Sequence, residues 1–359
     1  MTLSWSGKDR ALAGESHEEA ESEPLRTWST ADDASHLHAG DNLAALRSLA
    51  ARYEGKVTLA YLDPPFLTNK IHEALIKKDG ERFYTTAFDD RWSDQAAYLE
   101  AIAPRLVAIR TLLAPHGSIV IHVDPKTSHY LKVLADEIFG AHAFASEIVW
   151  RYRRWPAKTP NFQRVHDVLL RYRKDPKVLP RWNQPYEPLA ASTLATWGTK
   201  KQRAVVGKDG RRARSSSTSV ESAGVPMGDV WDIGVIAPIA RERTGYPSQK
   251  PEALLERLVG ALSDPGDVVL DPYAGSGTTL AVAARMGRAF LGIDRSEVAI
   301  ETARTRLAAA GIAMTSANAS EKKRPDLVSC PHPPPPSGVD LPQIAGLAGS
   351  GGGGRATRR

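Results

Sequence analysis

The sequence predicts a doubly wound α/β protein, in which helices cover both faces of a mostly parallel sheet. Two observations lead to this fold class. Short apolar runs alternate with segments of helical periodicity, and acidic residues follow several of the runs, at the strand ends where α/β sheets bind ligands. A third observation is a stretch over residues 175–228, rich in Arg, Ser, Gly and Pro, which interrupts the alternation and indicates an inserted module.

The predicted elements can be placed in chain order. Residues 57–62, VTLAYL, form a strand that ends at Asp63, and residues 94–113 carry apolar positions at helical spacing. The pattern then predicts strand 118–123, helix 127–140, strands 146–153 and 167–173, a helix opened by Pro251, strand 267–273, helix 278–287, strand 289–294 and a helix capped by Ser296.

The composition is that of an ordinary globular protein. The 359 residues are 42% hydrophobic and 25% charged, and no apolar run approaches the roughly 18 residues that a membrane helix needs. A single cysteine, Cys330, excludes an internal disulfide framework and a cysteine metal cluster. Because the N-terminus is polar and acidic rather than apolar, we expect a cytoplasmic protein.

The formal net charge of +6 is unevenly distributed along the chain. Residues 151–215 contain 17 Lys or Arg and 4 Asp or Glu, so the remainder is net acidic. This asymmetry indicates a surface for a polyanion, although a solvated basic loop would look the same. The acidic residues 1–25 and the Pro- and Gly-rich residues 315–359 are expected to be disordered, because neither can bury enough apolar surface to fold.

A glycine-rich turn, Asp271-Pro-Tyr-Ala-Gly275-Ser-Gly277-Thr-Thr, follows one strand and precedes a helix. Glycine lets the backbone approach a ligand closely. The turn lacks the lysine of a phosphate-binding loop, and Leu280 stands where the dinucleotide fingerprint has its third glycine. With these two sites excluded, the turn predicts a site for a nucleoside-like ligand. Asp294, at the end of the next strand, could accept hydrogen bonds from both ribose hydroxyls. An ordinary strand–helix turn is the alternative.

The tetrapeptide Asp63-Pro64-Pro65-Phe66 also follows a strand. Two prolines fix the backbone and remove two N–H donors, while their carbonyls remain as acceptors. The tetrapeptide therefore offers a carboxylate, a carbonyl and an aromatic ring, which complement the exocyclic amine of adenine or cytosine. Such acceptors can turn the nitrogen lone pair toward an incoming methyl group, and Asp63 can stabilise the developing charge or take the proton. Taken alone, the tetrapeptide is more typical of a proline turn.

Together and in this order, the two motifs resemble the β-arrangement amino-methylating DNA methyltransferases, a family that modifies adenine N6 or cytosine N4. In that family the catalytic motif comes first, the target-recognition region follows, and the cofactor motif comes last. The resemblance runs from about His36 to about Leu307, and its further landmarks are His38-Ala-Gly40-Asp41-Asn42, LLAPHGSIVIHVD, HDVLLRYRK, Asp229-Val-Trp-Asp-Ile and Thr244-Gly-Tyr-Pro-Ser-Gln-Lys-Pro251.

The resemblance implies an S-adenosylmethionine-dependent methyltransferase fold that is circularly permuted. The C-terminal cofactor strands would then lie beside the strand before Asp41. Residues 26–174 would be the catalytic half of the domain, residues 175–228 the target-recognition insertion and residues 229–314 the cofactor-binding half.

The resemblance also implies roles for single positions. Asp63 to Phe66 would hold a base rotated out of the duplex, and Asp41 would contact the adenine of the cofactor. Lys250 has an electrostatic reason to approach the carboxylate of S-adenosyl-L-methionine. The implied cofactor-binding residues are Asp41, Ser248, Gln249, Lys250, Asp271, Tyr273, Gly275, Gly277, Thr278 and Asp294.

Double-stranded DNA is the implied partner, held through its phosphates by basic residues. We expect Tyr152 and Tyr172 to be core residues, and residues 175–228 to recognise the target. The candidate DNA-binding residues are Arg151, Arg153, Arg154, Lys200, Lys201, Arg203, Arg211 and Arg212. No membrane or metal partner is expected, since the pairs His36/His38 and His122/Asp124 lack a third ligand. A homodimer and a cognate restriction endonuclease remain open.

Three other functions were compared with this one. Amino-methyltransferases of RNA or protein amides more often carry Asn-Pro-Pro-Tyr after the cofactor motif. A DNA-binding member that has lost catalysis is disfavoured by the intact Asp63 and Asp271, and an oxidoreductase is disfavoured by Leu280. Adenine N6 is favoured over cytosine N4 by analogy, because Asp-Pro-Pro is associated mainly with adenine in the family.

Overall fold

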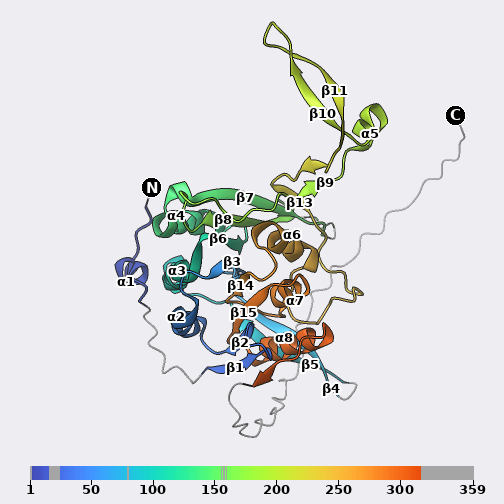
Figure 1. The fold of residues 1–359 in the computed structure, drawn as a ribbon. Helices are drawn as coiled ribbons and strands as arrows, with labels where there is room; N and C mark the ends of the chain where they lie inside the picture. The colour runs from blue at the N-terminus through green and yellow to red at the C-terminus, as the bar shows by residue number, and fades with distance from the viewer. Residues whose placement is uncertain are drawn as a thin grey trace, which may run out of the picture. The chain divides into compact units, whose positions relative to one another are not determined.

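A computed structural model of the protein describes residues 2–15, 25–78, 81–154, 156, 158 and 160–316, and Figure 1 draws its helices and strands. Ten strands of this part of the chain form one sheet. In spatial order they are β13 (Val230–Asp232), β7 (Phe144–Arg151), β8 (His166–Arg173), β6 (Leu113–Val123), β3 (Val57–Leu62), β14 (Val268–Asp271), β15 (Ala289–Asp294), β2 (His36–Ala39), β1 (Arg26–Ser29) and β16 (Thr315–Ser316).

The five central strands β6, β3, β14, β15 and β2 run parallel to one another. β8 lies antiparallel between β6 and β7, and β1 and β16 are antiparallel at the opposite edge. β3 and β15 coincide with the predicted strands 57–62 and 289–294. β6 begins earlier than predicted, because Leu113 already pairs with Val57 of β3.

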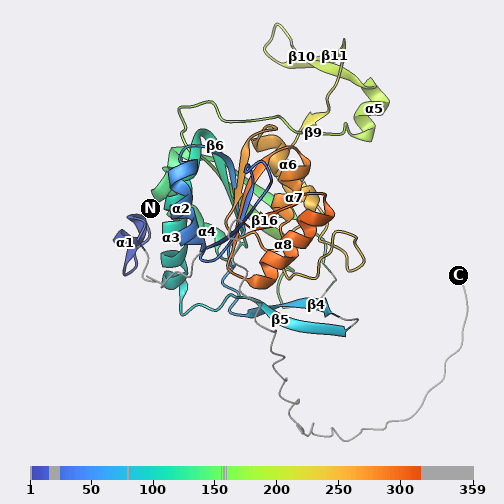
Figure 2. The ribbon, with the colours of Figure 1, turned by 60° about the horizontal axis from the view of Figure 1, so that its bottom comes forward.

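Helices cover both faces of the sheet, as Figure 2 shows. Residues of α2 (Asn42–Tyr53), α3 (Gln95–Leu112) and α4 (Ser128–Phe139) share one apolar cluster with the sheet, and residues of α6 (Glu252–Leu262), α7 (Thr278–Arg285) and α8 (Glu297–Ala309) share another. The predicted cap Ser296 accepts a hydrogen bond from the backbone of Ala299 at the start of α8. The doubly wound α/β class is therefore confirmed.

The chain changes direction across the sheet between β14 and β3. From β14 it passes through α7 to β15 on one side, whereas from β3 it passes through α3 to β6 on the other side. The carboxyl ends of two such strands open a crevice between them. β15 also pairs with β2, with Leu291 opposite His36, so the C-terminal strands lie beside the N-terminal strand as the permuted order predicts.

Two segments lie outside the main sheet. The hairpin of β4 (Ile71–Lys78) and β5 (Glu81–Asp89) follows the Asp-Pro-Pro-Phe loop, and we did not predict it. Its Leu75 N–H donates to the Gly245 carbonyl over 3.3 Å, which ties it to the loop before α6. The insertion 175–228 contains β9 (Tyr186–Glu187), α5 (Ala191–Trp197), β10 (Lys200–Val206), β11 (Arg212–Glu221) and β12 (Val225–Pro226).

The N-terminal segment corrects one prediction. Residues 2–15 are not a disordered lead, because α1 (Lys8–Leu12) packs against α3 and buries Ala11 completely. Trp5 and Leu12 also pack on the first apolar cluster, so this short stretch does bury apolar surface. Residues 16–24 and 317–359 lie outside the described residues, while Thr315 and Ser316 pair with β1. No helix of the described chain is long and apolar enough to cross a bilayer.

Gly277, the residue before α7, is expected to be needed for packing of the fold. It has φ 72°, and a Cβ there would lie 2.8 Å from the Ala303 Cβ of α8. Gly277→Ala should lower the free energy of unfolding by roughly 2–4 kcal/mol, from a left-handed residue plus overpacking. Gly55→Ala is the matched control, because φ is 67° and no atom lies within 4 Å of the added Cβ. Equal losses for the two variants in urea denaturation would contradict this reasoning.

Candidate active site

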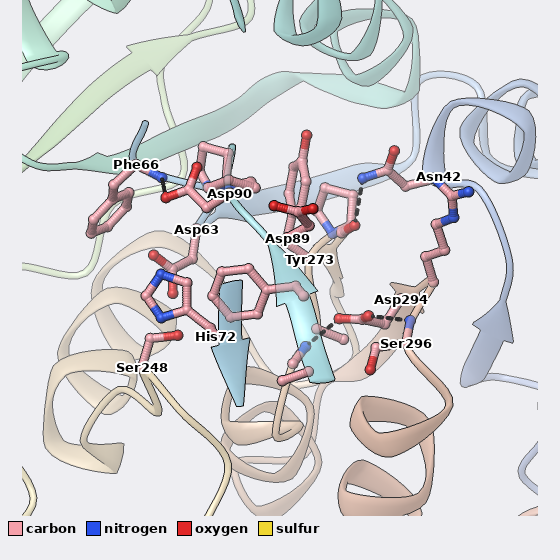
Figure 3. A pocket seen from close by; sticks show the side chains of 18 of the residues that line it. Asn42, Asp63, Phe66, His72, Asp89, Asp90, Ser248, Tyr273, Asp294 and Ser296 are labelled. Carbon is pink, nitrogen blue, oxygen red and sulfur yellow. Dashed lines mark hydrogen bonds between the residues drawn. The ribbon is translucent and has the colours of Figure 1, made fainter. Parts of the chain in front are cut away.

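A cleft of about 870 Å³ lies at the carboxyl ends of the central strands. In Figure 3, Asp63, Phe66, His72 and Ser248 lie apart from Asn42, Asp294 and Ser296 across this cleft. The structure brings together nearly all of the candidate catalytic and cofactor-binding residues, which come from distant parts of the chain. Those that line the cleft are Asp41, Asp63, Pro64, Pro65, Phe66, Ser248, Gln249, Lys250, Asp271, Tyr273, Gly275, Thr278 and Asp294.

The two glycines of the predicted cofactor turn have different roles. Gly275 lines the cleft with φ 49°, and a Cβ there would meet the Tyr246 ring at 3.3 Å. Its N–H donates to Asp294 Oδ2 over 2.8 Å, which joins the turn to the end of β15. Gly277 is not among the residues that line the cleft, and it allows α7 to approach α8. Gly277 therefore has a packing role in the fold, and its contact with the cofactor stays a prediction.

Two acids, Asp271 and Asp294, lie in the cleft at the ends of neighbouring strands. Burial raises the pKa of Asp294 to about 6 and that of Asp271 to about 7. Asp294 also accepts the Ser296 N–H over 2.8 Å, and Asp271 accepts the Tyr273 N–H over 3.0 Å. A ligand that carries positive charge would relieve this cost by favouring the ionised carboxylates.

Asp41 is held by a network that the sequence only partly indicated. It caps α2 by accepting the Ala44 N–H, and it forms an ion pair with Arg105 of α3 at 3.1 Å. Arg105 also donates to the Asn42 side chain over 2.5 Å, and Asn42 donates to the Pro272 carbonyl over 3.0 Å. Nothing in the helical pattern around Arg105 distinguished it from a surface arginine, so its place in the cleft required the fold.

Lys250 joins the loop before α6 to the Asp-Pro-Pro-Phe tetrapeptide. Its Nζ donates to Asp63 Oδ2 and lies 5.1 Å from the centre of the Phe66 ring. The lysine is only 8% exposed, so its charge is poorly solvated and requires this carboxylate as a partner. Asp63 Oδ1 receives no hydrogen bond from the described residues, and His122 Nδ1 lies 3.9 Å from it.

His122 packs behind the Phe66 ring of the tetrapeptide. It is fully buried, with its ring 5.6 Å from that of Phe66 and 5.5 Å from that of Trp150. Its Nδ1 lies 2.7 Å from the Tyr61 hydroxyl, and burial lowers its pKa, so the ring is neutral near pH 7. The sequence indicated His122 only within the run SIVIHV and as half of the rejected metal pair with Asp124.

Ser248 and Gln249 shape the loop before α6. Ser248 has φ 54°, which places this residue in the left-handed region. The Gln249 side chain accepts the Thr244 N–H over 2.9 Å and donates to the Glu242 carbonyl over 2.6 Å. Gln249 therefore fixes the shape of a loop that lines the cleft.

The candidate DNA-binding residues lie outside the cleft and are exposed where their side chains are described. Arg151 pairs with Asp232, and Lys200 pairs with Glu221 across the β10–β11 hairpin. The expected core residues Tyr152 and Tyr172 are buried, which confirms that prediction. The remaining candidates are Arg153 and Arg154 after β7, Lys201 and Arg203 on β10, Arg211 in the β10–β11 turn, and Arg212 on β11.

Comparisons with known proteins agree with this geometry. A family model described as DNA methylase, for N6 and N4 methyltransferases, matches residues 57–305. The chain is similar to the Type II methyltransferase M.EcaI of Enterobacter cloacae, with 31% identity over 319 residues that cover 75% of this chain and 68% of the relative. It is also similar to the DNA adenine methyltransferase YhdJ of Escherichia coli K12, with 29% identity over 84% of this chain and 91% of the relative.

A solved structure shares the fold. The cytosine-N4-specific PvuII DNA methyltransferase has a TM-score of 0.50 and 15% identity, over 76% of this chain and 86% of that chain. The extent of the family match shows that the chain belongs to the DNA methylase family of N6 and N4 amino-methyltransferases. It is an S-adenosylmethionine-dependent enzyme that methylates DNA, as the order of its motifs predicts.

Cofactor affinity is expected to depend on pH through Asp294. Above its pKa of about 6 the carboxylate is ionised and can accept two hydroxyl groups, whereas below it protonation removes the charge and one acceptor. The dissociation constant for S-adenosylmethionine should therefore rise as the pH falls from 8 to 5, by up to about tenfold per unit below pH 6. Calorimetric titration of wild type and Asp294→Asn tests this, because the variant should bind weakly and lose this part of the dependence. If both proteins showed the same pH profile, Asp294 would not be the group whose ionisation controls cofactor affinity.

Proposed function

We propose that the enzyme transfers a methyl group to N6 of adenine at a specific sequence in double-stranded DNA. The observation that carries this proposal is that Asp63 and Phe66 line the same cleft as Gly275 and Asp294. An amine acceptor and a stacking ring therefore share one cavity with a nucleoside-type site. Similarity to YhdJ, which is named a DNA adenine methyltransferase, supports adenine.

The cleft fits S-adenosylmethionine. Gly275 leaves the cleft open beside Tyr246, because an added Cβ would lie only 3.3 Å from the Tyr246 ring. The acids Asp271 and Asp294 suit a ligand that carries a sulfonium and an ammonium group. We assign the ribose to Asp294, the adenine to Asp41 and the amino-acid end to the segment that includes Ser248 and Lys250. When bound, the cofactor supplies an electrophilic methyl group.

Asp63 and its neighbours would hold the target amine. Lys250 occupies Oδ2 of Asp63, so Oδ1 can accept one amine N–H while the Pro64 carbonyl accepts the other. This arrangement directs the nitrogen lone pair toward the methyl donor, and the Phe66 ring stacks on the base. As the nitrogen becomes positively charged, Asp63 stabilises that charge and accepts the departing proton.

The duplex would be held by the basic insertion. The target base must leave the helix to reach the cleft, which costs a few kcal/mol. Exposed cations such as Lys201 and Arg203 on β10 can offset this cost through salt-sensitive phosphate contacts. We assign residues 175–228 to target recognition on this basis.

Cytosine N4 is the second candidate, because the structure with the same fold is named cytosine-N4-specific and both bases present an exocyclic amine.

We also propose that the enzyme acts in the cytoplasm, where its DNA substrate would be. The Type II names of two relatives support a role beside a cognate restriction endonuclease, and a homodimer is the assembly that we propose to test.

The function is tested by producing the protein in a host that lacks DNA methylation. Single-molecule sequencing of the host DNA should then reveal N6-methyladenine at one short motif. An empty vector and the Asp63→Ala variant serve as controls. N4-methylcytosine at a motif would replace adenine by the second candidate, and unmodified DNA from a folded, cofactor-binding protein would contradict the proposal.

Asp63→Ala should reduce the turnover number by about 10³-fold or more, because it removes the amine acceptor that is needed in the transition state. Affinity for S-adenosylmethionine should change far less than turnover, since Asp41, Asp271 and Asp294 do not contact Asp63 and only Lys250 among the assigned cofactor residues pairs with it. Methyl transfer from labelled cofactor and calorimetric binding measure the two effects separately. Parallel loss of cofactor binding would mean that Asp63 is misassigned.

A further inference from the structure

A second aspartate, Asp90, lies directly after β5 at the base of the β4–β5 hairpin. Its side chain is buried, with 1% of the residue exposed, although it lines the inner wall of the cleft. Because a buried carboxylate is costly unless hydrogen bonds satisfy it, its partners indicate what it holds in place. Most of those partners belong to the residues that come directly after the Asp-Pro-Pro motif.

Five hydrogen bonds converge on this carboxylate. Three come from consecutive backbone N–H groups, those of Phe66 at 3.2 Å, Leu67 at 3.0 Å and Thr68 at 2.8 Å. The Thr68 hydroxyl donates over 2.6 Å, and the Trp92 indole N–H donates over 3.0 Å. Successive backbone donors around one anion form a nest, in which the carboxylate fixes the backbone conformation.

The backbone that Asp90 holds is strained. Leu67 has φ 58° and Asn69 has φ 57°, and each non-glycine residue in the left-handed region costs about 1 kcal/mol or more. The Asn69 N–H also donates to the Asp90 carbonyl, and the Asp90 N–H donates to the Lys70 carbonyl. The β4–β5 hairpin therefore brings the chain back beside residues 66–70, where Asp90 bonds to them through both its backbone and its side chain.

This closure acts on the residue that is proposed to stack on the base. With its N–H fixed on Asp90, Phe66 lies between the His122 ring at 5.6 Å and the Lys250 ammonium group at 5.1 Å. The side chain of Leu67 packs into the first apolar cluster, which explains why the loop adopts a positive φ there. Loss of the carboxylate would release the loop while leaving Asp63 at the end of β3.

We propose that Asp90 is a positioning residue for methyl transfer, which holds residues 66–69 in the conformation that receives the flipped base. The inference rests on the proposed role of Phe66. Asp90 acts through the loop and does not touch the substrate amine. The role predicts a specific kinetic effect, in which turnover falls while cofactor binding is preserved.

The test is Asp90→Asn, which keeps the size of the side chain but turns an amide N–H₂ toward backbone N–H donors. Tritiated methyl transfer to unmethylated genomic DNA gives kcat and the two KM values, and calorimetry gives cofactor affinity. We expect kcat to fall by about 10²-fold, the cost of a small misplacement in the site, with cofactor Kd within about twofold of wild type. Asp267→Asn is the matched control.

Asp267 suits this purpose because its carboxylate also accepts a backbone N–H, from Asp264 at 2.7 Å, before the amino end of β14. Its variant should keep the wild-type kcat even if it loses stability. A milder change, Thr68→Val, removes one of the five donors and should lower kcat by a smaller factor. It keeps the proposal testable if Asp90→Asn does not fold.

Two results would overturn the proposal. One is a folded Asp90→Asn enzyme with kcat within threefold of wild type, and the other is a loss of cofactor affinity in parallel with kcat. The tritium assay counts methylation of either base. The ratio of variant kcat to wild-type kcat therefore tests Asp90 even if the target base is cytosine rather than adenine. Inactive wild-type enzyme would instead contradict the proposed function.

Discussion

The parallel pairing of β3 with β14 is the constraint on which the site depends. Leu270 lies opposite Ala60, so the two strands end side by side and their continuations leave in opposite directions. This geometry opens the crevice and delivers Asp63 and Asp271 to its floor from positions more than 200 residues apart in the chain. Helices on both faces exclude water from the strands, which gives these acids the low-dielectric surroundings that raise the pKa of Asp271.

Charge balance in the cleft follows from that burial. Asp271 and Asp294 have raised pKa values because burial disfavours their charged forms, and a cationic ligand favours those forms. Asp41 and Asp63 have local cations instead, in Arg105 and Lys250. The cleft therefore combines two buried acids that suit a sulfonium compound with two acids that are already paired with cations.

The loops at the cleft are fixed by contacts between distant segments. Gln249 shapes the loop before α6, and Asp90 holds the residues after the Asp-Pro-Pro-Phe tetrapeptide. The β4–β5 hairpin contacts the loop before α6 through Leu75. The insertion 175–228 stands apart from this network, because it is basic and none of its described apolar side chains belongs to the buried core. Preorganisation is thus concentrated where the chemistry occurs, and the basic segment is left for contacts with a polyanion.

The sequence by itself determined the fold class and the main strands, and it predicted the chemistry of both motifs. Periodicity and strand-end acids are local signals, so Asp63, Gly275 and Asp294 could be identified without coordinates. The order of the motifs also indicated the family. Composition misjudged residues 2–15, because burial of Ala11 depends on a surface of α3 almost a hundred residues away. Only the tertiary structure decided that Lys250 pairs with Asp63, that His122 packs against Phe66 and that Asp90 bonds to the loop after Pro65. Each contact joins segments that are far apart in the chain, and no local sequence pattern shows that they meet.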